Sequence, residues 1–249
     1  MVHTCLDSTT VLSSAIVHVR LKRHAFAVKN LGRSFVRWVV MDMKWFREAA
    51  AGLFEQDLDG PVVADDVRYK QMETQTQALK VMFMACVSEK KKIGLWEMRK
   101  EDWAKFTTKK GTPSKGIGWK FLFPYLQKIK DDSVRVLSPG TPIGIWLDRA
   151  PCHVARETQA ELTRLFGKNV VLQPPSSPDL NMLDSGVFPN MQKKVNLRGA
   201  NSIVDIRKAV NDVWDAAITS EHLSKVASRV RRNLIMMKKL KGGNWYIER

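Results

Sequence analysis

The chain has 249 residues, of which 44% are hydrophobic and 27% charged, a composition typical of a globular protein that buries a core. Its formal net charge of +16 favours a polyanionic partner, nucleic acid above all, although an anionic membrane surface satisfies the same electrostatics and some basic proteins bind neither. No apolar stretch reaches the roughly 20 residues of a membrane span. Neither a secretory signal nor closely spaced cysteines are present, so we expect a reducing compartment, the nucleus (or a nucleoid), rather than secretion.

The first half of the chain predicts a helix followed by three strands. Apolar residues recur at helical spacing over residues 11–30, and the β-branched and aromatic residues 35–42 are typical of a buried strand that ends at Asp42. Residues 80–87 and 93–98 predict two further strands. Lys90, Lys91 and Lys92 lie between them, and we expect these lysines at the tip of a hairpin.

The second half predicts alternating helices and strands and then helices alone. A polar loop over residues 99–116 leads into a helix near residues 117–129, and a short apolar run over residues 143–147 predicts a strand that ends before Asp148. The remaining predicted elements are a helix over 155–166 with a stop at Gly167, a strand over 170–172, and helices from 180 onward, over 202–217 and over 220–240, with Ser202 and Ser220 as N-caps. This order predicts a mixed α/β fold.

Three aspartates stand out because each is expected at a strand end or just after one: Asp42, Asp148 and Asp184. Ligands gather at the carboxyl ends of strands in α/β sheets, and converging carboxylates repel one another unless a hard divalent cation lies between them. A single aspartate in such a position is more often a turn or helix-cap residue. The sequence around each aspartate has to decide between these interpretations.

The surrounding motifs resemble those of mariner-type transposases. Residues 40–46 (Val-Met-Asp-Met-Lys-Trp-Phe) resemble the strand that carries the first catalytic aspartate, and residues 147–153 (Leu-Asp-Arg-Ala-Pro-Cys-His) are similar to the second motif. Residues 173–184 (Gln-Pro-Pro-Ser-Ser-Pro-Asp-Leu-Asn-Met-Leu-Asp) match the third and most specific motif. The 35 residues between Asp148 and Asp184 are close to the spacing usual in this family.

The resemblance implies an RNase H-like mixed sheet flanked by helices, with a helical C-terminal extension. It implies Mg²⁺ or Mn²⁺ as cofactor, Asp42 and Asp148 bridging two ions, and Asp184 holding the second ion. It also implies hydrolysis and strand transfer at the ends of a DNA transposon, with DNA and a second copy of the chain as partners and no small-molecule substrate. We accordingly divide the chain into an N-terminal helical remnant or linker (1–34), a catalytic domain (35–200) and a basic helical extension (201–249).

Several features depart from the family pattern. Met43 replaces the usual Glu after the first aspartate, Arg149 replaces the usual Asn after the second, and Pro189 should kink or end the helix that follows Asp184. Only some forty residues precede Asp42, too few for the family's helix-turn-helix units. A domesticated or degraded transposase that binds DNA without catalysis is therefore the alternative function, and a nuclease of the same fold acting on RNA is a third.

Other side chains are predicted to support the site or to bind nucleic acid. His153 and Arg149 are candidates for contacts around Asp148, although a structural histidine explains His153 equally well. Basic residues concentrate in segments 89–120 and 225–249, with Lys225, Arg229 and Arg232 on one helix face. We expect phosphate-backbone contacts from ten side chains: Lys90, Lys91, Lys92, Lys109, Lys110, Lys193, Lys194, Lys225, Arg229 and Arg232.

Overall fold

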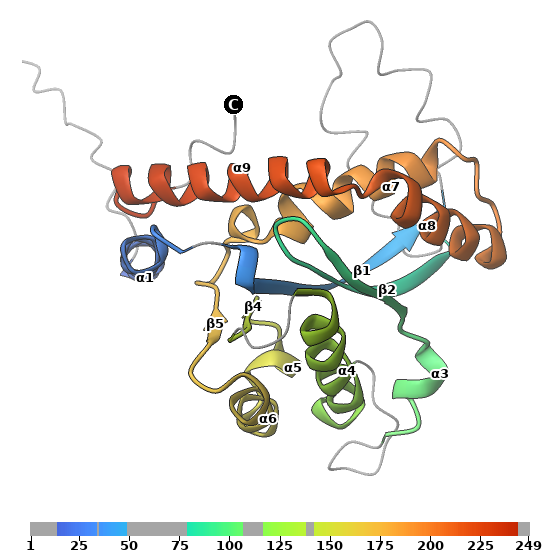
Figure 1. The fold of residues 1–249 in the computed structure, drawn as a ribbon, viewed down its shortest axis with the longest axis horizontal. Helices are drawn as coiled ribbons and strands as arrows, with labels where there is room; N and C mark the ends of the chain where they lie inside the picture. The colour runs from blue at the N-terminus through green and yellow to red at the C-terminus, as the bar shows by residue number, and fades with distance from the viewer. Residues whose placement is uncertain (1–13, 34, 49–78, 107–116, 138–141, 244–249) are drawn as a thin grey trace, which may run out of the picture.

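The computed structural model describes residues 14–33, 35–48, 79–106, 117–137 and 142–243 (Figure 1). Lys109 and Lys110 lie outside the described residues. The described elements, in chain order, are α1 (Ser14–Asn30), the 3₁₀ turn η1 (Phe35–Arg37), β1 (Trp38–Arg47), β2 (Lys80–Val87), β3 (Lys92–Glu97), α3 (Lys100–Trp103), α4 (Trp119–Leu137), β4 (Gly144–Leu147), α5 (Pro151–Val154), α6 (Arg156–Phe166), β5 (Val170–Leu172), the 3₁₀ turn η2 (Pro178–Leu180), the π turn η3 (Leu183–Val187), α7 (Phe188–Asn196), α8 (Ile203–Ala217) and α9 (Ser220–Lys239).

The five strands form one mixed sheet in the order β3-β2-β1-β4-β5. β1, β2 and β3 make an antiparallel meander, whereas β4 runs parallel to β1, and β5 runs parallel to β4. This topology confirms the expected RNase H-like mixed α/β fold. β1 is the central strand, paired with β2 along one edge and with β4 along the other, and its residues 39–42 are buried.

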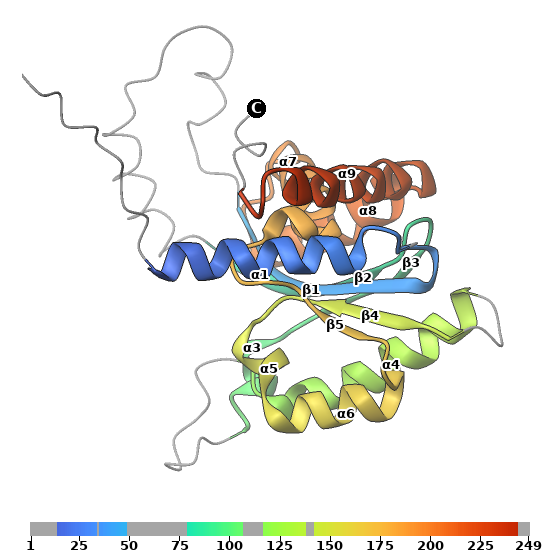
Figure 2. The same ribbon diagram turned by 90° about the vertical axis from the view of Figure 1, so that its left-hand side faces the viewer.

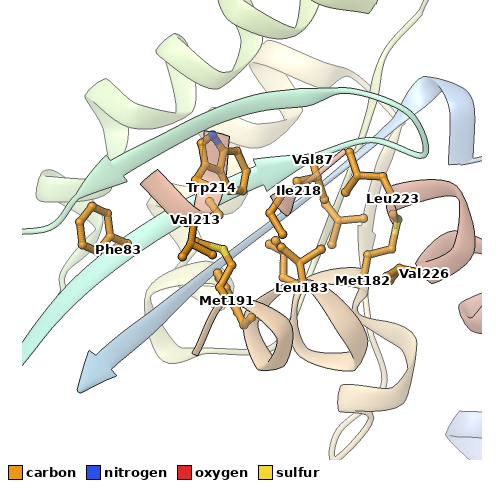
Figure 3. Packing of buried hydrophobic residues seen from close by; sticks show 14 of the residues in the cluster. Phe83, Val87, Met182, Leu183, Met191, Val213, Trp214, Ile218, Leu223 and Val226 are labelled. Atoms are coloured by element: carbon orange, nitrogen blue, oxygen red, sulfur yellow. The ribbon is translucent and has the colours of Figure 1, made fainter. Parts of the chain in front are cut away.

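Helices cover both faces of the sheet (Figures 1 and 2). α7, α8 and α9 lie on one face, while α4, α5 and α6 lie on the other. The period of two along β1 sends alternate side chains to two separate cores: Val39 and Met41 pack toward α4 and α6, and Val40 packs toward α7–α9. In the second core, side chains from β2 and from α7–α9 interdigitate, as Figure 3 shows for Val87, Met191 and Val226.

Both predicted end segments contribute to the α7–α9 core. α1 packs against α9, and its Phe26 ring meets the ring of Trp146 on β4 edge-on, with 5.1 Å between ring centroids. From the C-terminal segment, α8 and α9 contribute apolar side chains such as Ile206 and Leu234 to the same core. The division at residues 34 and 200 stays a prediction, but the side chains of all three segments meet in one cluster.

Two boundary predictions are wrong. β1 does not end at Asp42 but continues to Arg47, because Met43–Arg47 pair in register with β2 as far as Lys80. α9 is capped by Thr219 rather than by Ser220, since the Thr219 hydroxyl accepts the hydrogen bond from the backbone N–H of His222. The Ser202 cap and the Gly167 stop, which has φ +60°, are confirmed. Among the described helices, none is long and apolar enough to cross a membrane.

Candidate active site

The parallel pairing of β1 with β4 brings the first two aspartates together. The register joins Trp38 to Gly144 and Val40 to Trp146, and its continuation by two residues places Asp42 beside Asp148. The same period of two keeps Asp42 on the α7–α9 side of the sheet, where its side chain is buried. Asp148 follows directly after β4, as predicted, and is only partly buried.

Asp184 reaches this side of the sheet from the π turn η3 rather than from a regular helix. The backbone N–H of Phe188 bonds to the carbonyl of Leu183, five residues back, which widens the turn. Pro189 lies in the first turn of α7, directly after the π turn, and α7 continues through it to Asn196, so the helix does not end at this proline. Such π turns are frequent at functional sites because they redirect side chains.

Asn181 is the residue at this site that sequence reasoning missed. Its fully buried side chain donates from Nδ2 to Asp42 Oδ2 at 2.5 Å and to Asp184 Oδ2 at 3.4 Å, while its Oδ1 accepts from the backbone N–H of Leu183 at 2.9 Å. One amide therefore joins two of the three carboxylates. Its position three residues before Asp184 in the third motif was the available signal, since residues three apart on a helical turn share a face.

Burial and neighbouring charges shift the pKa values of Asp42 and Asp184 in the same direction. Burial, followed by the negative charges of Asp184 and Asp148, raises the pKa of Asp42 well above its ordinary value. Burial likewise raises the pKa of Asp184, although a hydrogen bond with Asp42 and the charge of Lys44 oppose that shift. The pair of Asp42 and Asp184 thus favours sharing a proton, as closely placed carboxyl groups do.

Asp148 has a different environment because His153 is its partner. The Asp148 Oδ1 atom lies 2.5 Å from Nδ1 of His153, whose ring is fully buried, and it also accepts from the backbone N–H of Ala150 at 3.0 Å. Burial alone would raise the pKa of Asp148, but the hydrogen bond and charge of His153 outweigh it and lower that pKa. Burial opposes protonation of the imidazole, yet the hydrogen bond to Asp148, followed by one to Cys152, raises the pKa of His153 to about 10. Asp148 and His153 therefore form an ion pair in which the imidazole is buried and the carboxylate is partly exposed.

The predicted basic residues differ in what they contact. The Arg149 Nε donates to the carbonyl of Gln173 at 2.8 Å and so ties the end of β4 to the end of β5. Lys92 lies in β3, and its Nζ donates to the carbonyl of Trp214 on α8 at 2.9 Å. Arg229 donates to the carbonyl of Ser185 in the π turn.

Arg229 is nevertheless exposed to solvent, and so are the remaining predicted basic residues within the described ranges. These remaining residues are Lys90, Lys91, Lys193, Lys194, Lys225 and Arg232. Lys225 is in an exposed pair with Glu221 on its own helix, an interaction that solvent screens strongly. The turn that holds Lys90 and Lys91 lies beside α9, because Glu89 in this turn pairs with Arg231. The nucleic-acid contacts of these side chains stay predictions.

A buried ion pair holds the third motif in place from α1. Arg23 lies 3.2 Å from Asp179 Oδ2, with both side chains 3% exposed, and it also donates to the hydroxyl of Ser177 at 2.6 Å and to the carbonyl of Ser176 at 2.7 Å. From the other side, Asn233 on α9 donates to the carbonyl of Asp179 at 2.8 Å. The loop that leads to Asn181 and Asp184 is therefore fixed by both ends of the described chain.

The carboxylate oxygens of the three aspartates are ligands that suit a hard divalent cation. In the present structure, however, these side chains are not arranged to coordinate one. Three carboxylates supply oxygen ligands of the kind that Mg²⁺ and Mn²⁺ prefer. A bound cation would also relieve the repulsion between the negative charges of these carboxylates. Within the described ranges, however, no three His, Cys, Asp or Glu side chains are placed so that they could hold a metal ion. The Asn181 amide lies between Asp42 and Asp184, and a bound cation would have to displace it from at least one of them.

The sheet order and the clustered aspartates define an RNase H-like domain with an acidic site on the central strand. Among solved structures, the chain is similar to the catalytic domain of Mos1 mariner transposase, with a TM-score of 0.64, 15% sequence identity, and 98% of this chain and 100% of that one covered. It is also similar to that catalytic domain with raltegravir and Mn (TM-score 0.64, 16% identity, 94% of this chain and 98% of that one). A third similar structure is the Mos1 paired-end complex with the left transposon end (TM-score 0.65, 17% identity, 98% of this chain and 68% of that one).

No protein-family model and no curated protein sequence matches the chain. The expected resemblance to mariner-type transposases is thus confirmed at the level of the fold.

Proposed function

We propose that the chain is a mariner-type transposase catalytic domain that cleaves and joins DNA with the help of a divalent metal. One observation carries the proposal: the Asn181 amide joins Asp42 on the central strand to Asp184 in the π turn, and Asp148 directly follows the neighbouring strand, in a fold shared with a mariner transposase. Burying three carboxyl groups close together costs stability. Acidic groups whose pKa values are shifted in this way are typical of functional sites.

The reaction class follows from the chemistry of the residues. In hydrolysis, the oxygen of a water molecule would form the new bond to phosphorus, the 3′-oxygen of the neighbouring nucleotide would leave, and the proton from water would pass to that oxygen. In strand transfer, a DNA 3′-hydroxyl would take the place of water. Mg²⁺ or Mn²⁺ held by Asp42, Asp148 and Asp184 would polarise the scissile phosphate and acidify the attacking group.

The protein's own residues would orient these groups. His153 fixes Asp148 through the bond from its Nδ1, and before a cation binds Asn181 joins Asp42 to Asp184. The structures of Mos1 with DNA ends support DNA as substrate, and the exposed lysines Lys193 and Lys194, close after Asp184 in the chain, are suited to the phosphate backbone. A homodimer and a nuclear location remain parts of the same proposal.

A nicking assay on supercoiled plasmid tests the proposal. With Mg²⁺ or Mn²⁺, wild-type protein should convert plasmid to the open circle, and Asp148→Ala should lower the rate by at least about 10²-fold, as the loss of a group that acts in the transition state does. Asp215→Ala is the matched control, because Asp215 is exposed on α8 with a side chain 81% accessible. Wild-type protein that binds plasmid but cuts no faster than Asp148→Ala would support the alternative, a transposase-derived protein that binds DNA without catalysis.

A further inference from the structure

Pro189 creates a defect in the helical segment that carries Asp184. In a continuous α-helix, the backbone N–H of residue 189 would bond to the carbonyl of Ser185, four residues back. Proline has no N–H, and the N–H of Phe188 is already bonded to Leu183. The carbonyl of Ser185, next to Asp184, therefore lacks the donor that a continuous α-helix would give it.

Arg229 supplies the missing hydrogen bond from another helix. Its Nη1 donates to the carbonyl of Ser185 at 2.7 Å, across 44 positions of sequence. Two further residues on the same face of α9, His222 and Val226, contact Gly186, which follows Ser185 in the turn. His222 hydrogen-bonds to the backbone of Gly186, and a Cβ on Gly186 would lie 2.5 Å from the Val226 Cγ2. Positions 222, 226 and 229 recur at steps of four and three, so one face of α9 contacts the π turn.

We infer that Arg229 is a positioning residue for Asp184: its guanidinium replaces the hydrogen bond that Pro189 removes and holds the π turn in the shape that directs Asp184 toward Asp42. The inference rests on the proposed function for its catalytic meaning. The charge of Arg229 alone predicts a phosphate contact, and the inference assigns this side chain a different role. Since Asn181 also bonds to Asp184, the turn is fixed from both the third motif and α9.

The defect and its repair allow a double-mutant test. Pro189→Ala restores an N–H four residues after Ser185, so it should make Arg229 dispensable. We would compare wild type, Arg229→Met, Pro189→Ala and the double variant, with Arg232→Met as control because Arg232 is exposed one turn further along α9. The first measurement is the affinity of the DNA-free protein for Mn²⁺, by electron paramagnetic resonance of the free ion.

Arg229→Met should weaken Mn²⁺ binding about three- to tenfold, the effect of losing one charge-assisted hydrogen bond, and the double variant should recover it to within about twofold of Pro189→Ala. Arg232→Met should leave it unchanged. A phosphate contact predicts a different pattern: unchanged Mn²⁺ affinity, a smaller salt dependence of DNA binding by about one counterion, and no recovery by Pro189→Ala. That pattern would overturn the inference.

Hydrogen exchange separates this inference from the proposed function. In the metal-free protein, Arg229→Met should accelerate amide exchange in peptides covering residues 183–188, and Pro189→Ala should reverse the change. Wild-type protein that neither binds Mn²⁺ nor nicks DNA would remove the proposed function, while the exchange pattern would still decide whether Arg229 holds the turn. Equal exchange in wild type and Arg229→Met would refute the role of Arg229 even in an active enzyme.

Discussion

Replacing Arg23 with methionine should destabilise the protein more than most single substitutions. The guanidinium lies 3.3 Å and 3.2 Å from the two carboxylate oxygens of Asp179 and also bonds to Ser177 Oγ and to the carbonyls of Ser176 and Gly242. Arg23→Met leaves a carboxylate that is 3% exposed without this partner. Breaking a buried ion pair from one side costs about 3–5 kcal/mol, which for a chain of this size corresponds to a fall in Tm of roughly 6–20 °C.

Urea denaturation followed by tryptophan fluorescence measures this loss. Lys22→Met, on an exposed position of the same helix, is the control and should change the free energy of unfolding by less than about 0.5 kcal/mol. Combining Arg23→Met with Asp179→Leu removes both charges and should recover most of the stability, because an apolar pair can replace a buried ion pair at little cost. A loss below about 1 kcal/mol for Arg23→Met, or additive losses in the double variant, would refute the assigned role of the pair.

Two further predictions concern the contact between α9 and the π turn. Gly186→Ala should cost about 1–3 kcal/mol by overpacking against the stiff side chain of Val226, and adding Val226→Ala should relieve most of it; equal unfolding midpoints for Gly186→Ala and wild type would contradict the close approach. Burial, together with the charges of Arg229 and Lys225 on α9 and Lys194 on α7, lowers the pKa of His222. The unfolded chain therefore binds the proton more readily, so stability present above about pH 6.5 should be lost as pH falls through the lower folded pKa. His222→Gln should flatten the pH dependence of the unfolding free energy between about pH 7 and 5, and an unchanged slope would count against the shift.

The sequence singles out the candidate site residues more readily than it predicts the local geometry around them, and the catalytic role of those residues stays a prediction. The three aspartates could be found because each lies in a short motif with its own composition and spacing. The strand that carries Asp42 was cut short at that residue, because Met43–Arg47 has no clear alternation of apolar and polar side chains. Its continuation is set by pairing with β2, a contact between residues about forty positions apart that no local pattern reveals.

Charge patterns were the least informative signal. Lys92 and Arg229 belong to basic clusters that predict phosphate contacts, yet both donate to main-chain carbonyls of the protein itself. Proximity in sequence does not show which basic side chains donate to a carbonyl on another helix, and whether Lys92 and Arg229 also contact phosphates stays a prediction. Pro189 was the available signal in the sequence, because a proline has no N–H and so leaves a carbonyl in the preceding turn in need of another donor.

The bond from Arg23 to the carbonyl of Gly242 has a consequence for the order of events during synthesis. These residues are 219 positions apart, and Gly242, at φ +85°, passes so close to the main chain of Arg20 that no side chain could fit there. The pocket for the Arg23 guanidinium is therefore complete only after nearly the whole described chain has left the ribosome. Contacts of such long range form late because their loop-closure entropy must be overcome first. The loop that leads to Asp184 would thus be among the last of the described parts to become ordered, and a nascent chain would lack an ordered candidate site until α9 had docked.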